Sequence, residues 1–416
     1  MTEMRILHVI TRLIVGGAQD NTLSTVVGQS RTNGFQVSLV AGIDDGPEGN
    51  LHEQARSQNV DLHLMPELVR PIAPWTDCVA VAKLVQLIRR GRYDVVHTHS
   101  SKAGIVGRIA ARIAGTPIVV HTLHGLVFGE HTSSGRNALY VGLKRFCARL
   151  TDRIISVSDA TRSGALAARI GRPEQHVTIY SGFPLEPFLE ISRRLPMAEA
   201  KKRIGFAADD LVAGKVGRLF SQKGHDHFLE AARQIAAQSP RARFLVVGDG
   251  ILRAALEAKS SELGIRDRVL FTGLVAPTAV PALIQAMDVL VHTSEKEGLA
   301  RAIPQAMVAG KPVVGFALDG TPEVVAHGVT GYLARPLDPG DVARHVTKLF
   351  GDPEKRRSMG SAGRLLATRL FSVENMVSRI NQVYLEVAEE RLKKALPLPS
   401  PARAPRESET VSFEQP

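Results

Sequence analysis

Short apolar runs alternate with amphipathic stretches along this chain. In the first half, the runs that we interpret as buried strands are residues 6–10, 37–41, 62–65, 95–98, 118–122, 154–157 and 177–180. Runs of this length, bounded by glycine or polar residues, are typical of strands, and the stretches between them have the spacing of helices. Because alternating strands and helices favour parallel strands covered by helices on both faces, the pattern predicts an α/β fold.

A second block of the same kind follows the first. We expect its strands at residues 212–217, 244–247, 269–273, 288–291 and 312–316. Between the blocks, residues 181–196 are rich in proline and lack periodicity, which indicates a linker. The pattern therefore predicts a domain at 1–185, a linker at 186–198 and a second domain at 199–370.

The end of the chain is first helical and then loses its pattern. One face of residues 373–392 carries Val377, Ile380, Val383, Tyr384 and Val387. This spacing predicts a C-terminal helix over 371–395. The tail 396–416 is rich in proline and polar residues, so we expect it to be disordered.

Composition is that of a globular protein with more than one domain. At 416 residues the chain is long enough for two cores, and 44% hydrophobic residues with 36 glycines are usual for α/β proteins. No apolar run approaches the roughly 18 residues that span a membrane. The N-terminus enters a strand without a signal-peptide pattern, so we expect a cytoplasmic protein. Cys78 and Cys147 form no disulfide framework and are expected to be buried.

Positive charge is concentrated in one stretch of the chain. The net charge is +11, yet residues 1–82 hold 5 lysines and arginines against 9 acidic residues, whereas residues 83–172 hold 15 against 4. Such a stretch can attract nucleic acid, an anionic membrane or an acidic substrate. A nucleic-acid-binding protein is disfavoured, because the chain has only five tyrosines and one tryptophan for stacking and no recognisable binding module.

Within the basic stretch, residues 137–152 are predicted to form an amphipathic helix. Its apolar face carries Leu139, Leu143, Phe146 and Leu150, and off that face lie Lys144, Arg145 and Arg149. One interpretation is that the apolar face packs into the protein. The other is that the stretch 136–153 rests on an anionic membrane surface.

Residues 292–325 contain two loops that carry carboxylates. One predicted strand leads into a polar loop with Glu295 and Glu297, and the next, 312–316, leads into the loop 319–323. Because the carboxyl ends of parallel strands meet at one edge of a sheet, where ligands bind, we expect both loops at a ligand site.

The first of these loops suits a ligand that is part phosphate and part sugar. Pro304 fits only in the first turn of a helix, so a helix begins just before it. Near that start, the amides of Gly298, Leu299 and Ala300 can hold phosphate oxygens. The carboxylate of Glu297 repels phosphate but accepts hydrogen bonds from hydroxyls. A nucleotide sugar has both groups; an ordinary capped helix is the alternative.

Two further strand-to-helix turns carry chemistry. Arg218 and Lys223 lie on either side of a turn, where a guanidinium and an ammonium can hold a diphosphate, although solvated surface charges are the alternative. Gly16 and Gly17 follow the first strand and would let a ligand approach the backbone. The dinucleotide fingerprint G-x-G-x-x-G is absent from that turn.

Histidines follow two strands of the first block. His97 and His99 end one strand, and His121 and His124 end the next, so we expect all four to face the edge of the sheet. Hydrogen bonds to the backbone are the simplest interpretation. A zinc site is the alternative, but no cysteine or carboxylate has the supporting spacing.

Together these motifs resemble the retaining glycosyltransferases of the GT-B fold, family four (glycosyl transferases group 1). Glu297, with the segments AMVAGKPVV and DGTPEVV, follows the signature of that family. Arg218 and Lys223 follow its GR-x-x-x-x-KG motif. Gln305 departs from the pattern, because the family has a second glutamate at this position.

The resemblance implies two Rossmann-like, doubly wound domains that face each other across a cleft. Residues 1–185 would be the acceptor domain, 199–370 the nucleotide-sugar donor domain, and the helix at 371–395 would cross back to the first. The implied activity is a retaining, metal-independent transfer of a hexosyl or N-acetylhexosaminyl group from a nucleoside diphosphate sugar, with a UDP-sugar favoured. The acceptor would be a hydroxyl of a lipid-linked or polysaccharide precursor of the cell envelope. No Asp-x-Asp metal motif is present, and neither a cofactor nor nucleic acid is expected.

The resemblance also implies roles for individual residues. The catalytic pair would be Glu297 and His124. Donor binding would involve Arg218, Lys223, Gly298, Leu299, Ala300, Gln305, Gly248, Gly250 and Gly273. The acceptor and phosphate loop would include Gly16, Gly17, His99 and Lys102. No metal site is implied.

Two alternatives remain open at this point. Gln305 could mark a non-catalytic subunit that binds a nucleotide sugar, and such a subunit would show neither donor hydrolysis nor transfer. A sugar-nucleotide epimerase on the same fold would convert the donor without an acceptor. The place of action is expected to be the cytoplasm, and the inner face of the membrane if 136–153 binds lipid.

Overall fold

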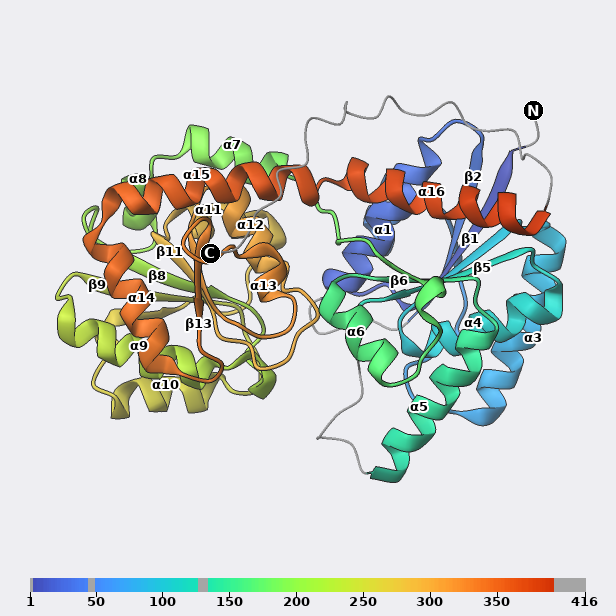
Figure 1. Cartoon of the computed structure of the whole chain (residues 1–416), viewed down its shortest axis with the longest axis horizontal. Helices are drawn as coiled ribbons and strands as arrows, with labels where there is room; N and C mark the ends of the chain where they lie inside the picture. Colours follow the sequence, from blue (N-terminus) through green and yellow to red (C-terminus); the bar gives the residue numbers. More distant parts are fainter. Residues whose placement is uncertain (1–2, 44–48, 126–133, 393–416) are drawn as a thin grey trace.

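The computed structural model describes residues 3–43, 49–125 and 134–392 and shows two α/β lobes side by side (Figure 1). Each lobe is built on its own parallel sheet, and helices cover both faces of each sheet. The predicted disordered tail, 396–416, lies outside the described residues. No described helix is both long and apolar enough to cross a membrane.

The N-terminal sheet has seven strands in the order β3-β2-β1-β4-β5-β6-β7, all paired in parallel. The strands are β1 (Met4–Arg12), β2 (Phe35–Gly42), β3 (Asp61–Leu64), β4 (Val95–His99), β5 (Ile118–Leu123), β6 (Arg153–Ser156) and β7 (His176–Thr178). The helices are α1 (Gly17–Ser30), α2 (His52–Ser57), α3 (Pro74–Gly91), α4 (Ser101–Ala114), α5 (Ser134–Arg149), α6 (Asp159–Ala167) and the short η1 (Pro173–Gln175).

The C-terminal sheet has six parallel strands in the order β10-β9-β8-β11-β12-β13. The strands are β8 (Leu211–Val216), β9 (Ala242–Val247), β10 (Val269–Phe271), β11 (Val289–His292), β12 (Val313–Phe316) and β13 (Gly331–Ala334). The helices are α9 (His225–Gln238), α10 (Arg253–Glu262), α11 (Val280–Gln285), α12 (Ala302–Val308), α13 (Thr321–Val324), α14 (Pro339–Gly351) and α15 (Pro353–Leu370), with short turns η2 (Ser221–Lys223), η3 (Arg266–Arg268) and η4 (Pro277–Ala279).

Both sheets reverse their strand order at an equivalent point. In the N-terminal sheet the chain runs outward from β1 to β3 and then returns to place β4 on the other side of β1. In the C-terminal sheet β8 and β11 are neighbours in the same way. Loops that leave such a pair of strands diverge and form a crevice at the carboxyl edge of the sheet. The topology therefore places the loops after β1, β4, β8 and β11 at two binding crevices.

The segment that composition predicts as a linker, 186–198, is mostly helical. It contains α7 (Glu186–Arg194) and the start of α8 (Met197–Arg203). Pro187 lies in the first turn of α7, and Pro196 caps α8, so both prolines begin helices. Buried Phe188 packs against Phe183, which ties the segment to the core of the C-terminal lobe.

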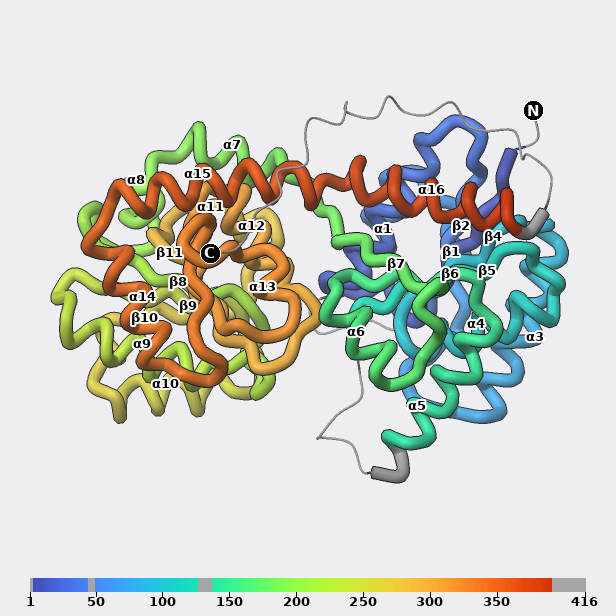
Figure 2. The backbone as a smooth tube through the Cα atoms, in the orientation of Figure 1, coloured from blue at the N-terminus to red at the C-terminus, as the bar shows by residue number. Residues whose placement is uncertain are grey.

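The last helix, α16 (Val373–Leu392), leaves the C-terminal lobe and packs along the N-terminal lobe (Figures 1 and 2). Its predicted apolar face joins the core around β1 and α1 through Val377, Ile380, Val383, Tyr384 and Val387. Gly28 of α1 allows the close approach, because a Cβ there would lie 2.6 Å from a methyl carbon of Val377. One apolar stripe thus fastens the two lobes together.

Helix α5 turns a different face inward from the one its sequence predicts. Lys144, expected off the apolar face, is buried together with Cys147 and Ala148, whereas Leu139 and Phe146 are exposed. The buried face contacts α4, where the buried Arg108 lies, so the packing partner rather than apolar periodicity sets the orientation. The prediction that both cysteines are buried is also wrong, since Cys78 on α3 is exposed.

Candidate functional site

An ion pair between Lys223 and Glu297 lies at the crevice of the C-terminal sheet. Lys223 follows β8 and Glu297 follows β11, and the lysine Nζ lies 2.5 Å from Oε1 of the carboxylate. His292, at the end of β11, places its Nε2 3.8 Å from the other carboxylate oxygen. Burial opposes the charged form of Glu297, but Lys223 and His292 outweigh it, so the pKa is lowered. The group is therefore a charged carboxylate paired with the ammonium of Lys223, whereas burial lowers the pKa of His292 to about 3 and keeps its imidazole neutral.

A second lysine lies beside this pair. Lys215 is a buried residue of β8 whose ammonium donates a hydrogen bond to Oγ1 of Thr293 over 2.8 Å. Burial and the nearby Lys223 lower the pKa of Lys215 to about 7, while Glu297 acts in the opposite direction. Lys215 adds positive charge beside the pair of Lys223 and Glu297, which favours an anionic ligand at this crevice.

A small pocket opens next to Glu297. Its walls are His292, Ser294, Glu297, Gly298, Leu299, Ala300, Leu318, Asp319, Gly320 and Thr321. Within the described part of the chain, the amides of Gly298, Leu299 and Ala300 have no protein acceptor. Asp319 shapes the loop by accepting a hydrogen bond from the amide of Glu297 over 2.5 Å. The pocket thus offers amide donors and a carboxylate acceptor side by side.

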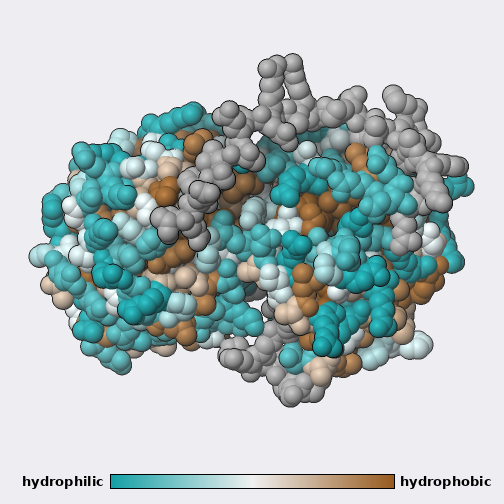
Figure 3. Space-filling view, viewed as in Figure 1, coloured by the Kyte–Doolittle hydropathy of each residue, from teal (hydrophilic) through white to brown (hydrophobic). Residues whose placement is uncertain are grey.

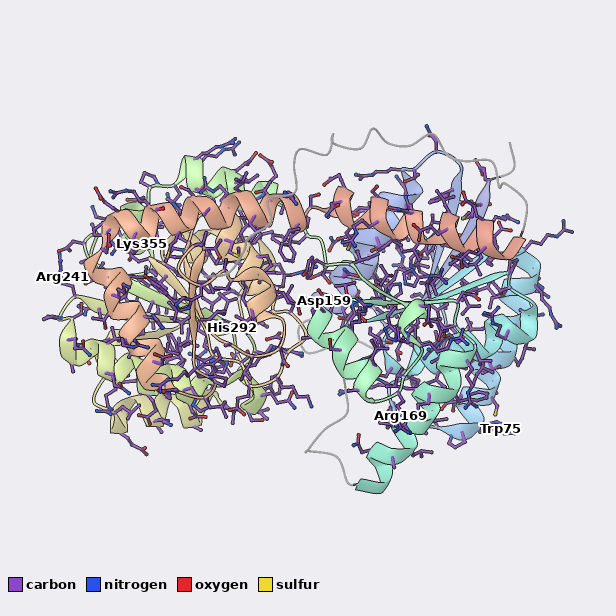
Figure 4. All side chains as sticks on the ribbon, in the orientation of Figure 1. Trp75, Asp159, Arg169, Arg241, His292 and Lys355 are labelled. Atoms are coloured by element: carbon purple, nitrogen blue, oxygen red, sulfur yellow. The ribbon has the colours of Figure 1, made fainter. Side chains whose placement is uncertain are left out.

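Two polar contacts bring the N-terminal lobe to this pocket. Arg301, which follows the pocket loop, places a guanidinium nitrogen 2.8 Å from the carboxylate of Asp20 in the first turn of α1. Glu323 of α13 accepts hydrogen bonds from the amides of Asp159 (2.8 Å) and Ala160 (2.7 Å) at the start of α6. Figure 4 shows Asp159 at the border of the N-terminal lobe that faces the C-terminal lobe. The pocket therefore lies between the lobes, and Figure 3 shows a narrow gap there.

His124 lies across this border from Gly298. A Cβ on Gly298 would lie 2.8 Å from Oγ1 of Thr161 and 3.6 Å from the carbonyl oxygen of His124, so the glycine lets the two lobes approach. Nε2 of His124 lies 3.2 Å from Nδ1 of His99. Burial, with a smaller contribution from Arg301, lowers the pKa of His124 to about 4. His124 therefore carries a neutral imidazole at the border between the lobes.

The predicted loop residues of the N-terminal lobe divide into two groups. Gly16 and Gly17 begin α1 one turn before Asp20, which contacts the C-terminal lobe, so they lie near the border. Lys102 does not join them. Its ammonium is held by Asp77 at 2.5 Å and by the carbonyl of Pro71, which directs the side chain toward the start of α3.

The two cations of the predicted clamp also differ. Lys223 points to Glu297, whereas Arg218 is exposed at the surface with its guanidinium 5.3 Å from the centre of the Phe220 ring. Gln305 is half-buried in α12, and its backbone amide donates to the carbonyl of Arg301.

The predicted donor glycines of the C-terminal lobe pack against backbone. Gly248, with a φ of 130°, would place a Cβ 2.3 Å from the carbonyl oxygen of Gly217, and it forms a bridge with Gly273. A Cβ on Gly250 would likewise lie 2.6 Å from the carbonyl oxygen of Leu219. These glycines hold the turn after β8 in shape, whether or not a ligand is bound.

Three of the four histidines expected at the sheet edge, His97, His99 and His121, are buried in the interior. His97 is fully buried between the hydroxyls of Tyr384 (2.5 Å) and Thr122 (2.7 Å), and buried His121 bonds to Thr98. His97 also belongs to a group with His8 and His99 whose nitrogens lie within 4.8 Å of one another, a spacing that a metal ion could bridge.

Every ring nitrogen of that group already has a protein partner. Four of the partners lie outside the group, namely Gln29, Tyr384, Thr122 and His124, and His8 and His99 bond to each other. The donor set therefore fits a hydrogen-bonded network better than the zinc site left open by the sequence.

Several residues of this region are missed by sequence reasoning. Lys215 and His8 each interrupt an apolar strand, and that interruption is a signal that could have found them. Asp20 and Arg301 have no such signal, because only the packing of the two lobes brings them together.

Two family models match the chain, one for each lobe. Residues 16–182 match the model described as a glycosyl transferase 4-like domain, and residues 196–366 match the model described as glycosyl transferases group 1.

Relatives match over most of their length. The UDP-Gal:alpha-D-GlcNAc-diphosphoundecaprenol alpha-1,3-galactosyltransferase of Escherichia coli is 30% identical over 391 residues, which are 93% of this chain and 98% of the relative. The 2-deoxystreptamine glucosyltransferase of Streptomyces kanamyceticus is 30% identical over 71% of this chain and 78% of its own length. The structure of Anabaena Alr3699/HepE with UDP and glucose has a TM-score of 0.75 at 26% identity and covers 92% of this chain and 99% of that one.

Proposed function

The chain belongs to the glycosyl transferases group 1 family with the GT-B fold and transfers sugars from nucleotide sugars, and on this premise we propose a retaining, metal-independent hexosyl- or N-acetylhexosaminyl-transferase. The proposed donor is a UDP-sugar, and the proposed acceptor is a hydroxyl of a lipid-linked or polysaccharide precursor. The Escherichia coli relative is named for transfer from UDP-Gal to a diphosphoundecaprenol-linked sugar, and Alr3699/HepE binds UDP and glucose, which supports both choices.

The observation that carries the proposal is the pairing of Lys223 with Glu297 beside the open amides of 298–300. An ammonium and amides suit a diphosphate, and a carboxylate suits sugar hydroxyls. Both kinds of group line one pocket at the lobe border, opposite His124. A nucleotide sugar is the ligand class that needs both at this spacing.

In the proposed reaction, the bond from the anomeric carbon to the diphosphate oxygen breaks, and its electron pair stays on the diphosphate. Lys223, Arg218 and the amides of the pocket stabilise this developing charge more than they stabilise the ground state. The acceptor oxygen bonds to the anomeric carbon on the face that the diphosphate leaves, and the acceptor proton passes to the departing phosphate oxygen. The anomeric configuration is therefore retained.

Other residues orient the donor in this proposal. Glu297 accepts hydrogen bonds from hydroxyls of the transferred sugar, and His124 contacts the sugar from the other lobe. Gln305 replaces the second glutamate of the family at the ribose. A neutral amide accepts a hydrogen bond more weakly than a carboxylate does, so we expect modestly weaker donor binding and intact catalysis.

We further propose that α5 rests on an anionic membrane surface, at the inner face of the membrane. Leu139 and Phe146 are 59% and 49% exposed, and Arg145 and Arg149 are exposed on the same helix. Trp75, at 83% exposure, lies on the edge of the N-terminal lobe away from the C-terminal lobe (Figure 4). Exposed apolar side chains among arginines favour an interface between water and anionic lipid.

The transferase proposal is tested by a thermal-shift screen of nucleotide sugars followed by NMR of the product. We expect a UDP-sugar to stabilise the protein and the product to keep the anomeric configuration of the donor, with turnover unchanged by EDTA. An inverted product would overturn retention. Donor conversion without acceptor would indicate an epimerase, and donor binding without any turnover would indicate a non-catalytic subunit.

The membrane proposal is tested by co-sedimentation with anionic and zwitterionic vesicles. We expect binding to anionic vesicles only, and loss of binding when Leu139 and Phe146 are both replaced by serine. Leu365→Ser is the matched control, because Leu365 is 77% exposed on α15 of the other lobe. Failure of the unmodified protein to sediment would overturn the proposal.

A further inference from the structure

A line of hydrogen bonds runs from α16 through the N-terminal lobe to the cleft. Asn381 of α16 bonds to Gln29 of α1 (2.8 Å), and Gln29 bonds to His8 of β1 (2.7 Å). His8 bonds to His99 at the end of β4 (2.9 Å), and His99 bonds to His124 (3.2 Å). Gln29 and His8 are fully buried and His99 is 1% exposed, so water does not compete for the two inner bonds of the line, whereas Asn381 and His124 at its ends are half-buried.

The three imidazoles of this line are neutral. Burial lowers the pKa of His8 to about 4 and that of His124 to about 4, and it holds the pKa of His99 well below its ordinary value. A neutral imidazole has one N–H donor and one acceptor nitrogen. Each histidine in the line must therefore donate on one side and accept on the other, so the direction of one bond determines the direction of all.

The direction begins at Gln29. Its amide nitrogen donates to Oδ1 of Asn381, and its carbonyl oxygen therefore faces Nε2 of His8. Nε2 of His8 must carry the proton, which leaves Nδ1 of His8 to accept from Nε2 of His99. Nδ1 of His99 then accepts from Nε2 of His124. At the end of the line, Nδ1 of His124 is left with a lone pair.

A side branch of the same cluster does not enter the line. His97 stacks near His99 with ring centres 4.3 Å apart, but its nitrogens bond to Tyr384 and Thr122. The hydroxyls of Tyr384 and Thr122 can each donate or accept, and Tyr384 also interacts with Gln29, so it is the Thr122 side of His97 that does not touch the line. The branch therefore supplies a control within the same cluster.

We propose that the line from Asn381 through Gln29, His8 and His99 sets the tautomer of His124, with the proton on Nε2 and Nδ1 presented as an acceptor to a hydroxyl of the bound sugar. This role rests on the proposed function, and it makes Gln29, His8 and His99 positioning residues that act through His124. A fixed acceptor selects a sugar that places a hydroxyl at that nitrogen, because the wrong tautomer would present an N–H instead. Helix α16 thus acts on the cleft as well as joining the lobes.

The test uses the full chain labelled with ¹⁵N-histidine. In the wild type we expect His124 to show a protonated Nε2 and an unprotonated Nδ1. Gln29→Met removes the acceptor for His8 and should leave a mixture of tautomers, with kcat lower by roughly tenfold and acceptor KM unchanged.

The matched control is Thr122→Val, which removes a bond of His97 but none of the line. It should leave the His124 tautomer unchanged, and melting curves of all variants should show a folded protein.

Three results would overturn the inference. One is a proton on Nδ1 of His124 in the wild type, and another is an unchanged tautomer in Gln29→Met. The third is a stoichiometric metal ion on His8, His97 and His99 in the purified protein, because it would need the nitrogens that the line uses. If transfer activity is absent while the tautomers respond as expected, the proposed function fails and the line itself stands.

Discussion

The two lobes have the same strand order around their crevices, but the residues at the C-terminal crevice are charged and those at the N-terminal crevice are neutral. At the C-terminal crevice, Lys215 and Lys223 surround the charged carboxylate of Glu297. At the N-terminal crevice the corresponding strands carry buried neutral histidines, His8 in the middle of β1 and His99 at the end of β4. The scaffold is shared, so the residues at the strand ends make the difference.

That contrast suits the two parts of a sugar diphosphate. Charge develops on the diphosphate during transfer, and fixed cations stabilise it without reorganising. The sugar and the acceptor are neutral, so a positive charge beside them would bring no benefit and would attract water. Burial keeps His124 neutral and leaves it only the ability to donate and accept hydrogen bonds.

The largest effect is expected at Glu297. Replacing it by alanine removes the carboxylate that holds the sugar and should lower kcat/KM by roughly 10²–10³-fold, as loss of one preorganised active-site group does. The control is Glu295→Ala, because Glu295 is 46% exposed and its carboxylate pairs with His227 at 3.2 Å, away from the pocket. A Glu297→Ala enzyme with full activity would show that this carboxylate at the C-terminal crevice does not contact the reacting sugar.

Lys223 should matter mainly for the diphosphate. Lys223→Met is expected to weaken UDP binding by roughly 10–100-fold, because a hydrogen bond between charged groups contributes about 1.5–3 kcal/mol. Calorimetric titration with UDP measures this effect. Lys355→Met, at the outer end of α15 (Figure 4), removes the same charge and should leave affinity unchanged. Equal losses of UDP affinity in both variants would show that Lys223 acts only through its long-range charge and not through a direct contact.

The next largest effect is expected at acidic pH, which should destabilise the two lobes to different degrees. A histidine whose pKa is lowered by folding takes up a proton on unfolding, so its contribution is complete above about pH 6.5 and is lost as the pH falls toward 4. For His8, with a pKa of about 4 in the folded chain, the loss at pH 5 is on the order of 2 kcal/mol.

Because five such histidines share the N-terminal cluster, hydrogen exchange at pH 5 should show that lobe opening before the C-terminal lobe, where His225 and His292 have a pKa of about 3. His8→Gln should make the change in hydrogen exchange of the N-terminal lobe between pH 7 and pH 5 smaller. Earlier opening of the C-terminal lobe would contradict this assignment.

The smallest effect is expected where the two lobes meet. Asp20 and Arg301 form a partly exposed ion pair, so a double-mutant cycle with Asp20→Asn and Arg301→Gln should give a coupling of roughly 1 kcal/mol. In kinetics this corresponds to a donor KM raised about fivefold, because closure over the donor is weaker. Additive effects of the two substitutions would show that the pair does not hold the lobes together.

Local features were predictable from the sequence. Helix α16 spans Val373–Leu392, within the range 371–395 that we predict, and its predicted face is the one that packs on the N-terminal lobe. The strands β1 to β12 fall within a few residues of the predicted apolar runs, whereas β13 was not predicted. Periodicity works here because each element buries one face, and burial of that face leaves its spacing in the sequence.

The orientation of α5 was not predictable in this way. Its spacing points to a face with Leu139 and Phe146, yet the structure buries Lys144 instead. Burial and the nearby Arg108 lower the pKa of Lys144 to about 8. Burying this lysine therefore costs free energy, which the spacing of apolar residues cannot reveal. Which face turns inward depends on the neighbouring helix α4, and that neighbour is not encoded in the spacing of α5 itself.

By itself, the sequence determined the two α/β lobes, the strand-end loops and most residue types of the candidate site, because those follow from local spacing and from motifs. Only the tertiary structure decided that Lys223 pairs with Glu297, that Asp20 meets Arg301, and that Asn381 reaches His124 through buried bonds. Such contacts join residues far apart in the chain, and they arise from the order of strands in each sheet and from the docking of one lobe on the other. No local pattern carries that information.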